Sequence, residues 1–241
     1  MKSLKIVICG YGRMGHEVEK AAICKGHSII ATIDEASDWF SKKEDIGQGD
    51  VVIDFSLPHT ASDNTFHALS SGLPIVIGTT GWKPDYQLIE KLCLGNKVGF
   101  ILGANFSIGM NILFSVQKQL ARLTAKVGGY RPSVTETHHI HKKDAPSGTA
   151  IHLANDLLSA YPSMDKWVNE HTDDPTCLPI ISYREGEVPG THITTFTSVD
   201  DIITLKHEAL GRSGLANGAV LAAEWIIGKT GIHSFEEVLG L

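Results

Sequence analysis

The chain lacks several features that would assign it to a particular class of protein. Its four cysteines are widely scattered and form no C-x-x-C pair, so neither a disulfide framework nor a zinc ribbon is indicated. The first apolar stretch ends at Gly10, which makes it too short for a signal peptide or a membrane span. Internal repeats and low-complexity linkers are absent. We therefore expect a cytoplasmic protein that is not inserted in a membrane.

The sequence also has no excess of positive charge. With 21 Lys and Arg against 27 Asp and Glu, the formal net charge is -6, which gives no general attraction to nucleic acid or to an anionic membrane. The 42% hydrophobic content is ordinary for a globular protein, and 241 residues can bury a sizeable core. Any binding of an anion must therefore come from a local group of residues, and we expect a small-molecule partner.

Short apolar runs alternate with helical patterns over the first part of the chain. We read strands at 4–9, 29–33, 51–55, 74–77 and 98–102, and helices near 13–25, 60–71 and 84–94. This alternation predicts a parallel sheet with helical crossovers. The polar interval 35–50 predicts only a short or irregular crossover.

The pattern changes beyond residue 105. The expected elements are a helix at 108–126, a strand at 131–139, a helix at 148–160, strands at 178–184, 192–198 and 202–208, and helices at 214–228 and 234–239. Successive strands without intervening helices favour a mostly antiparallel sheet. We expect an α/β fold, in which a Rossmann-like dinucleotide-binding domain (residues 1–106 plus 213–241) is joined to a second, α+β domain (residues 107–212).

The first predicted strand runs into Gly10-Tyr-Gly12-Arg-Met-Gly15, a G-x-G-x-x-G pattern that opens a helix. The first glycine permits a tight turn, the second lets a pyrophosphate approach the backbone, and the third allows close packing of helix and strand. The second strand ends at Asp34, where an acidic side chain can bind the adenosine ribose. A merely glycine-rich turn and a solvated carboxylate are the alternatives, but the combination favours a dinucleotide site.

The charges at this position bear on the choice of cofactor. Asp34 and Glu35 stand where the 2′-phosphate of NADPH would lie, and two carboxylates repel it. Arg13, in the same turn, can pair with that phosphate. We expect NADH to be favoured, with NADPH as the alternative.

Two more glycine-bearing turns follow predicted strands, namely Gly78-Thr-Thr-Gly81 and Gly103-Ala-Asn-Phe-Ser107. Ligands of open parallel sheets bind beyond the carboxyl ends of the strands, so both turns are placed to line a nicotinamide. Plain turns at strand ends are the alternative reading.

The most informative segment is 136–150, Glu-Thr-His-His-Ile-His-Lys-Lys-Asp-Ala-Pro-Ser-Gly-Thr-Ala. If it is extended, Glu136, His138 and Lys142 point to one side. Ser147 to Thr149 precede a helical pattern, and the unpaired N–H groups at a helix start can bind a carboxylate or phosphate. Ordinary capping is the alternative. The density of proton donors favours a site for an anionic substrate.

These motifs, together with Ala216-Asn-Gly-Ala219, resemble those of bacterial dihydrodipicolinate reductases, also called 4-hydroxy-tetrahydrodipicolinate reductases, and they occur in order over nearly the whole chain. The resemblance implies an oxidoreductase that uses a nicotinamide dinucleotide to reduce a cyclic dicarboxylate on the route to diaminopimelate and lysine. It also implies that residues 107–212 bind the substrate and form a homotetramer through their sheet.

The resemblance implies roles for individual residues. His138 corresponds to the general acid and Lys142 to a second proton donor and substrate anchor, and a histidine beside a cation suits this chemistry. His139, Gly148 and Thr149 correspond to substrate-binding positions, beside Ser147. The implied cofactor-binding residues are Gly10, Tyr11, Gly12, Arg13, Met14, Gly15, Asp34, Gly78, Thr79, Thr80, Ala104, Asn105 and Phe106.

Three rival functions remain. A metal-dependent hydrolase would use His138, His139, His141 and Asp144, but neighbouring histidines on a strand point to opposite faces, so we expect no metal. A non-catalytic dinucleotide sensor and a nicotinamide reductase of another small carboxylate are the others. We assign no role to the remaining histidines, among them His192.

Overall fold

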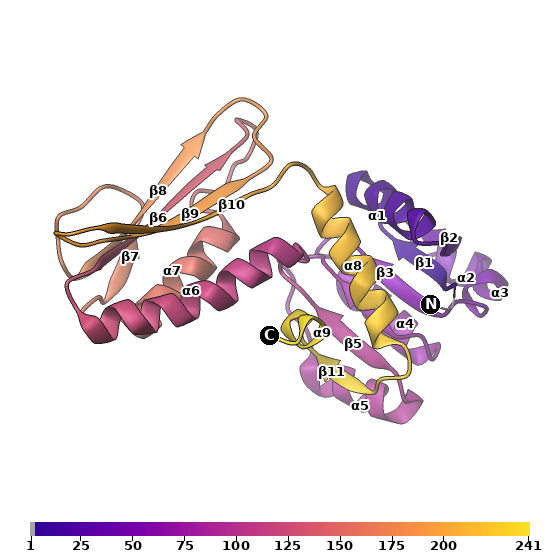
Figure 1. Ribbon diagram of the computed structural model, residues 1–241. Coiled ribbons are helices and arrows are strands. Elements are labelled where there is room, and N and C mark those ends of the chain that lie inside the picture. The colour runs from indigo at the N-terminus through magenta and orange to yellow at the C-terminus, as the bar shows by residue number, and fades with distance from the viewer. Residues whose placement is uncertain (1–2) are drawn as a thin grey trace. The chain divides into compact units, whose positions relative to one another are not determined.

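A computed structural model describes residues 3–241 (Figure 1). The chain divides into two compact units. The first runs to Ile108 and also includes Arg212–Leu241, and the second is Gly109–Gly211. The chain thus leaves the first unit and returns to it close to the boundaries expected from the sequence. The assignment of cofactor and substrate to separate units stays a prediction.

The first unit is built on a six-stranded sheet in which all neighbouring strands are parallel. Its order is β11-β5-β4-β3-β1-β2, with β1 Lys5–Cys9, β2 Ser28–Ile33, β3 Val51–Asp54, β4 Ile75–Ile77, β5 Gly99–Leu102 and β11 Gly231–His233. The predicted Rossmann-like α/β fold is confirmed. The edge strand β11 was not predicted, because its sequence Gly-Ile-His has a single apolar residue, whereas the equally short β4 is an apolar run of three.

Helices cover both faces of this sheet because the side chains of each strand alternate between them. In β1, Ile6 and Ile8 belong to one core, and Val7 and Cys9 to the other. The first core is closed by α1 Arg13–Cys24, α8 Ser213–Ile226 and α9 Phe235–Leu239. The second is closed by α2 Asp38–Ser41, α3 Lys43–Ile46, α4 Ala61–Ser70 and α5 Tyr86–Asn96. The short crossover expected at 35–50 is therefore formed by two single-turn helices.

The returning C-terminal segment is tied to the first unit by both packing and charge. Helix α8 packs on α1, and Glu224 of α8 accepts from Lys25 Nζ at 2.7 Å. The buried ring of His27 lies between the two ends of the chain, with Nδ1 accepting from the Leu4 N–H and Nε2 3.0 Å from Glu224. These contacts explain why a segment distant in sequence completes the N-terminal fold.

The second unit has a five-stranded sheet in the order β10-β9-β6-β8-β7. Its elements are α6 Ile108–Val127, which starts in the first unit, β6 Arg131–His138, α7 Gly148–Ala160, β7 Lys166–Val168, β8 Cys177–Arg184, β9 Thr191–Thr197 and β10 Ile202–Glu208. The sheet packs against α6 and α7 through one shared apolar core.

The expectation of a mostly antiparallel sheet was wrong. Strands β10, β9 and β6 pair antiparallel, but β6, β8 and β7 pair parallel. The chain passes through α7 between β6 and β7, and such a helical crossover returns the next strand in the same direction. Side-chain periodicity does not report strand direction, and the short β7 escaped detection.

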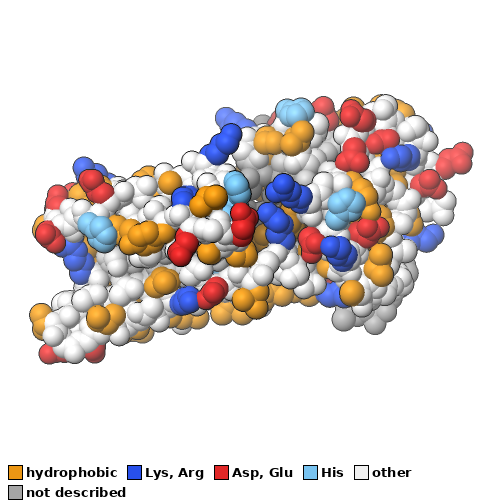
Figure 2. Space-filling model, turned by 90° about the horizontal axis from the view of Figure 1, so that it is seen from above, with side chains coloured by type: hydrophobic (Ala, Val, Ile, Leu, Met, Phe, Trp, Pro, Cys, Tyr) orange, Lys and Arg blue, Asp and Glu red, His pale blue; other side chains and the backbone are white. Residues whose placement is uncertain are grey.

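Charged side chains of both signs are visible on the face shown in Figure 2, which agrees with the moderate net charge. No helix within residues 3–241 is long and apolar enough to cross a membrane. The four cysteines are free thiols.

Candidate active site

The glycine turn between β1 and α1 has the backbone geometry that a dinucleotide requires. Gly10 has a φ of +80°, and a Cβ there would lie 2.5 Å from the carbonyl oxygen of Phe55. A Cβ on Gly15 would overlap the carbonyl of Gly10. Gly12 differs, because a Cβ there would meet nothing within 4 Å. The turn is thus closely packed against the protein at Gly10 and Gly15, and it has free space next to Gly12.

The start of α1 is suited to an anion. Gly12 caps the helix without a side-chain hydrogen bond, and the first turn contains no acidic residue. The first N–H groups of a helix have no intrahelical partners and carry the positive end of its dipole. A pyrophosphate therefore fits the open side of this turn.

Asp34 lies beside the turn, as predicted for a ribose-binding carboxylate. Its Oδ1 accepts from the N–H of Tyr11 at 2.7 Å. The next loop is held by Asp38, which accepts from the N–H groups of Asp34 and Glu35, and these bonds lower the pKa of Asp38 to about 2. Lys42 pairs with Asp38 at 3.0 Å and donates to the carbonyl of Thr32.

Most predicted nicotinamide-lining residues follow β4 and β5, but their side chains are not equally free. Phe106 is 1% exposed and its ring packs between Phe55 and Phe235, so only its backbone can face a ligand. Thr79 is buried and donates to Asp54 at 2.5 Å. Of the other predicted residues, Gly78, Asn105 and Met14 are half-buried, and Arg13, Thr80 and Ala104 are exposed.

Asp54, at the end of β3, is a residue that the sequence reading missed. Its carboxylate is 0% exposed and accepts from Thr79, from the N–H and hydroxyl of Ser56, and from Asn64. A buried carboxylate with this many donors joins the ends of neighbouring strands. It holds the loop that carries Thr79 in place.

The strand expected at 131–139 is confirmed to within one residue. Strand β6 stops at His138, and a turn follows in which the Lys142 N–H donates to the carbonyl of His139. The alternation argument therefore holds for Glu136 and His138. It does not extend to Lys142, because the condition of a longer strand is not met. The charge of Lys142 nonetheless acts on His138.

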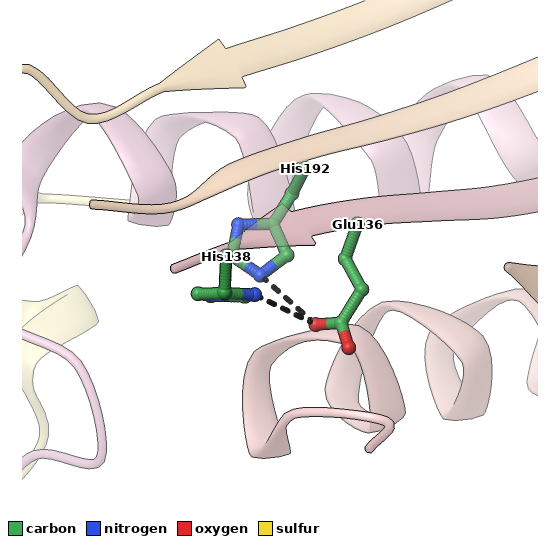
Figure 3. A group of neighbouring side chains, drawn as sticks. All are labelled: Glu136, His138 and His192. Carbon is green, nitrogen blue, oxygen red and sulfur yellow. Dashed lines mark ion pairs between the residues drawn. The ribbon is translucent and has the colours of Figure 1, made fainter. Parts of the chain in front are cut away.

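Glu136 lies at the centre of a buried cluster (Figure 3). It shares the buried face of β6 with His138. The register of the sheet places His192 of β9 opposite Glu136 on one side and Ser182 of β8 opposite it on the other. Oε2 of Glu136 lies 3.4 Å from Nδ1 of His138 and 3.7 Å from Nε2 of His192.

The other carboxylate oxygen of Glu136 is held by three donors. Oε1 accepts from the Ser147 N–H at 3.0 Å, from Ser182 Oγ at 2.8 Å and from Arg184 Nη2 at 3.3 Å. Burial raises the pKa of Glu136, but the hydrogen bonds from Ser147 and Ser182 and the charge of His138 outweigh it and lower the pKa. Glu136 is therefore ionised at neutral pH.

The two histidines of the cluster differ in their surroundings. Burial lowers the pKa of His138, the charges of Lys142 and Arg184 act in the same direction, and Glu136 opposes them. Burial lowers the pKa of His192 further, to about 4. At neutral pH His192 is uncharged. The net shift of the His138 pKa is also downward, and Glu136 is the largest of the influences that favour its protonated form.

Helix α7 begins at this cluster. Ser147 is 3% exposed and caps the helix, accepting from the Ala150 N–H at 3.2 Å, and its hydroxyl lies 3.3 Å from Nε2 of His192. The side chain of Ser147 is thus engaged in capping, a contact that is typically worth about 1 kcal/mol. The N–H groups of Gly148 and Thr149 precede the first intrahelical bond, from Ile151 to Ser147, and are the groups that can receive an anion.

The loop after β6 is held by Arg184. Its guanidinium donates to the carbonyls of Lys142 and Asp144, and the Lys142 ammonium pairs with both carboxylate oxygens of Asp144 at 2.8 Å. The half-buried His139 lies in the turn, with its ring centroid 6.0 Å from that of His141. The position of the Lys142 ammonium therefore depends on β8, because Arg184 of that strand holds the backbone of the loop.

The cluster can also hold a metal ion in principle. Glu136, His138 and His192 each offer one ligand atom, and these atoms lie within 4.8 Å of one another. This is not the set of histidines that the sequence suggested for a hydrolase. The positive charges of Lys142 and Arg184 act on His138 and oppose a divalent cation there.

The sequence reading assigned no function to Glu136, His192 or Arg184. The spacing of Glu136 and His138 was the one available signal, because residues two apart share a face of a strand. His192 and Arg184 carry no such signal, since only the register of β6 with β9 and β8 brings them to the cluster.

Comparisons with known proteins match both units of the chain to one family. The family model described as "Dihydrodipicolinate reductase, N-terminus" matches residues 4–106, and "Dihydrodipicolinate reductase, C-terminus" matches residues 109–239. The chain is 37% identical over 238 residues to a 4-hydroxy-tetrahydrodipicolinate reductase of Christiangramia forsetii, with 98% of each chain covered. It is 35% identical to the enzyme of that name from Zymomonas mobilis, over 99% of this chain and 98% of the other.

A solved structure has the same fold. The dipicolinate-bound dihydrodipicolinate reductase from Paenisporosarcina sp. TG-14 matches with a TM-score of 0.80 and 23% identity, covering 98% of this chain and 99% of that one.

Proposed function

The chain belongs to the dihydrodipicolinate reductase family, and on this premise we propose how its residues divide the reduction of 4-hydroxy-tetrahydrodipicolinate to tetrahydrodipicolinate, a step of diaminopimelate and lysine biosynthesis. Reductases of this family use a nicotinamide cofactor. The observation that carries the assignment is the joint placement of a buried Glu136–His138 pair, the Lys142 loop and the start of α7 in one unit.

The first unit binds the dinucleotide in this proposal. The open backbone at Gly12 and the start of α1 receive the pyrophosphate, and Asp34 binds the adenosine ribose. The turns that contain Gly78, Thr79 and Thr80 and Ala104, Asn105 and Phe106 follow β4 and β5 and line the nicotinamide. Because the side chains of Thr79 and Phe106 are directed into the fold, these two residues contribute mainly backbone.

NADH is the favoured cofactor in this proposal. Three carboxylates, Asp34, Glu35 and Asp38, gather after β2, and each disfavours a 2′-phosphate. Lys42, a nearby cation, is already engaged by Asp38 and a backbone carbonyl. Arg13, in the glycine turn, is an exposed cation that can pair with the 2′-phosphate of NADPH.

The second unit binds and protonates the substrate. The conversion releases the 4-hydroxyl of the substrate as water. A bound nicotinamide dinucleotide would supply the hydride, and His138 donates a proton to the carbon that gains electron density beside the reduced position. Lys142 and the N–H groups of Gly148 and Thr149 hold a substrate carboxylate, and His139 lines the same loop. The capping role of Ser147 makes it a support for this site, through α7 and Glu136.

The assembly in this proposal is a homotetramer formed through the sheet of the second unit. One face of that sheet packs on α6 and α7. The opposite face carries Ile193 and Thr195, half-buried, and Ile202, 64% exposed, and can pair with a second copy. A tetramer should sediment with four times the mass of the chain, and a monomer at micromolar concentration would contradict it. The four free cysteines agree with a cytoplasmic location.

The test of function is the decay of nicotinamide absorbance with purified protein. NADH and NADPH are offered separately, and the unstable substrate is generated in place from pyruvate and aspartate semialdehyde by its synthase. Decay that requires the complete substrate mixture supports the reductase, and a faster rate with NADH supports the cofactor assignment. Dinucleotide binding without decay would favour a sensor or a reductase of another carboxylate.

A further inference from the structure

Glu136 has an arrangement that a merely structural carboxylate does not need. It is 0% exposed, and one oxygen, Oε1, receives the donors from Ser147, Ser182 and Arg184. Among residues 3–241 the other oxygen, Oε2, has no hydrogen-bond donor. The carboxylate is therefore anchored from one side, and its second oxygen is left for the histidines.

That second oxygen faces two imidazoles. Figure 3 shows His138 and His192 directed at the same carboxylate oxygen, from neighbouring strands. Nδ1 of His138 lies 3.4 Å from Oε2 and is also without a hydrogen bond in the described chain. Catalytic hydrogen bonds are often long in a protein without its substrate and shorten when the substrate binds. The Nδ1–H of His138 is the donor that Oε2 lacks.

On the other side of the ring, Nε2 of His138 lies next to Gly190, which has no side chain. A Cβ on Gly190 would lie 3.1 Å from Nε2 of His138, and Gly190 has a φ of +156°. The ring of His192 meets that of His138 edge to face, with centroids 5.0 Å apart. The ring is thus fixed by Glu136 at Nδ1 and by His192 at its side, while Nε2 faces a position without a side chain.

We propose that Glu136 is a positioning residue for proton transfer: it accepts from Nδ1–H of His138 and favours the imidazolium, whose Nε2–H delivers its proton to the substrate. This inference rests on the proposed function of His138. His192 stays neutral in this arrangement. Its ring packs against the ring of His138, and its Nε2 contacts the hydroxyl of Ser147. The proton leaves Nε2 for the substrate carbon, and water restores it afterwards.

The electrostatic consequence has a definite sign. The groups whose charges act on this cluster are Glu136, Lys142, Asp144, Arg184, His192 and His207. Among those acting on His138, Glu136 is the first that raises its pKa, and burial, Lys142 and Arg184 lower it. An acid works while protonated, so kcat/KM falls as pH rises through this pKa. Removing the charge of Glu136 must move that fall to lower pH.

The first experiment compares Glu136→Gln with wild type by two readouts. One is the pH profile of kcat/KM with saturating NADH, and the other is an NMR titration of ring-labelled histidines in the full-length protein, with His138 identified by its absence in His138→Gln. We expect both the kinetic limb and the His138 titration to move to lower pH, and turnover at neutral pH to fall about tenfold or more. NADH affinity should not change.

The matched control is Glu187→Gln. Glu187 also pairs with a histidine, His141, at 3.1 Å, but both side chains are exposed, at 79% and 67%. The control should leave the pH profile and the His138 titration where they are. An equal shift in the control would show that the effect of Glu136 is only a change in overall charge, and would overturn the proposal.

A second variant decides the question if Glu136→Gln does not fold. Glu136→Asp keeps the charge but withdraws the carboxylate from Nδ1 of His138. The fall of kcat/KM with rising pH should therefore occur at a lower pH than in wild type, but by a smaller shift than is expected for Glu136→Gln. Unchanged kinetics and an unchanged His138 titration in a folded variant would overturn the proposal.

Failure of the proposed function has a different signature. Turnover that survives His138→Gln would remove the acid itself, and with it the role of Glu136. A shifted titration in a protein that reduces nothing would refute the reductase assignment, while the Glu136–His138 contact would stand.

Discussion

The turn after β1 and the cluster around Glu136 are built in opposite ways. The turn is made of backbone from six consecutive residues, Gly10 to Gly15, and its shape depends on missing side chains. The cluster is made of side chains from β6, β8, β9 and the start of α7. A site formed by the backbone can be encoded in one stretch of sequence. A site formed by side chains from several strands exists only if those strands pair in the right register.

The two regions should therefore fail differently when they are mutated. A change in the turn should weaken cofactor binding or the fold, because glycine packing serves both. A change in the cluster should affect proton transfer while the cofactor still binds.

The largest expected effect is at His138. His138→Gln should lower kcat about a hundredfold or more, the contribution typical of general acid catalysis, with NADH affinity unchanged. Steady-state kinetics and equilibrium binding of NADH measure the two. His141→Gln is the control, since His141 is exposed and paired with Glu187, and it should keep full activity. A loss of NADH binding in His138→Gln would contradict the assignment of cofactor binding and proton transfer to two different regions.

Two glycines of the turn allow the cofactor site to be separated from the fold. Gly12→Ala should weaken NADH binding about tenfold, or about 1.4 kcal/mol, without lowering the Tm, because its Cβ meets no protein atom within 4 Å. Gly10→Ala should lower the Tm, because a left-handed φ costs an L-residue about 1–2 kcal/mol and its Cβ meets the backbone of Phe55. Thermal unfolding with and without NADH distinguishes them. Equal Tm values for both variants would contradict the packing argument.

A smaller effect is expected at Asp34. Asp34→Asn keeps an oxygen for the Tyr11 N–H but removes a charge from the position of a 2′-phosphate. Repulsion of about 1 kcal/mol at contact distance in water corresponds to about a fivefold rise in preference for NADPH over NADH. The ratio of kcat/KM for the two cofactors is the measurement. An unchanged ratio would place the ribose elsewhere.

No effect is expected from removing metal ions. Dialysis against a chelator should leave turnover unchanged. In this proposal Glu136 and His138 act in proton transfer and do not coordinate a metal ion. Activity that is lost on dialysis and restored by zinc would show that Glu136, His138 and His192 act as ligands, the other arrangement open to this group.

The sequence predicted the first region in more detail than the second. The G-x-G-x-x-G spacing and the acidic residue after β2 are local signals, and the structure places both beyond the carboxyl ends of β1 and β2. It also identified the segment around His138. It placed the end of that strand within one residue, but the position of Lys142 relative to His138 is set by the turn that follows and not by strand alternation.

The composition and local patterns of this chain determined its α/β class, the glycine turn, the position of Asp34 and the identity of the histidine and lysine loop. Tertiary structure alone decided that β8 runs parallel to β6, that His192 faces Glu136, and that Arg184 holds the Lys142 loop. The physical reason is range: turns and helix starts depend on neighbours in sequence, whereas strand register is set by the packing of whole faces against a shared core.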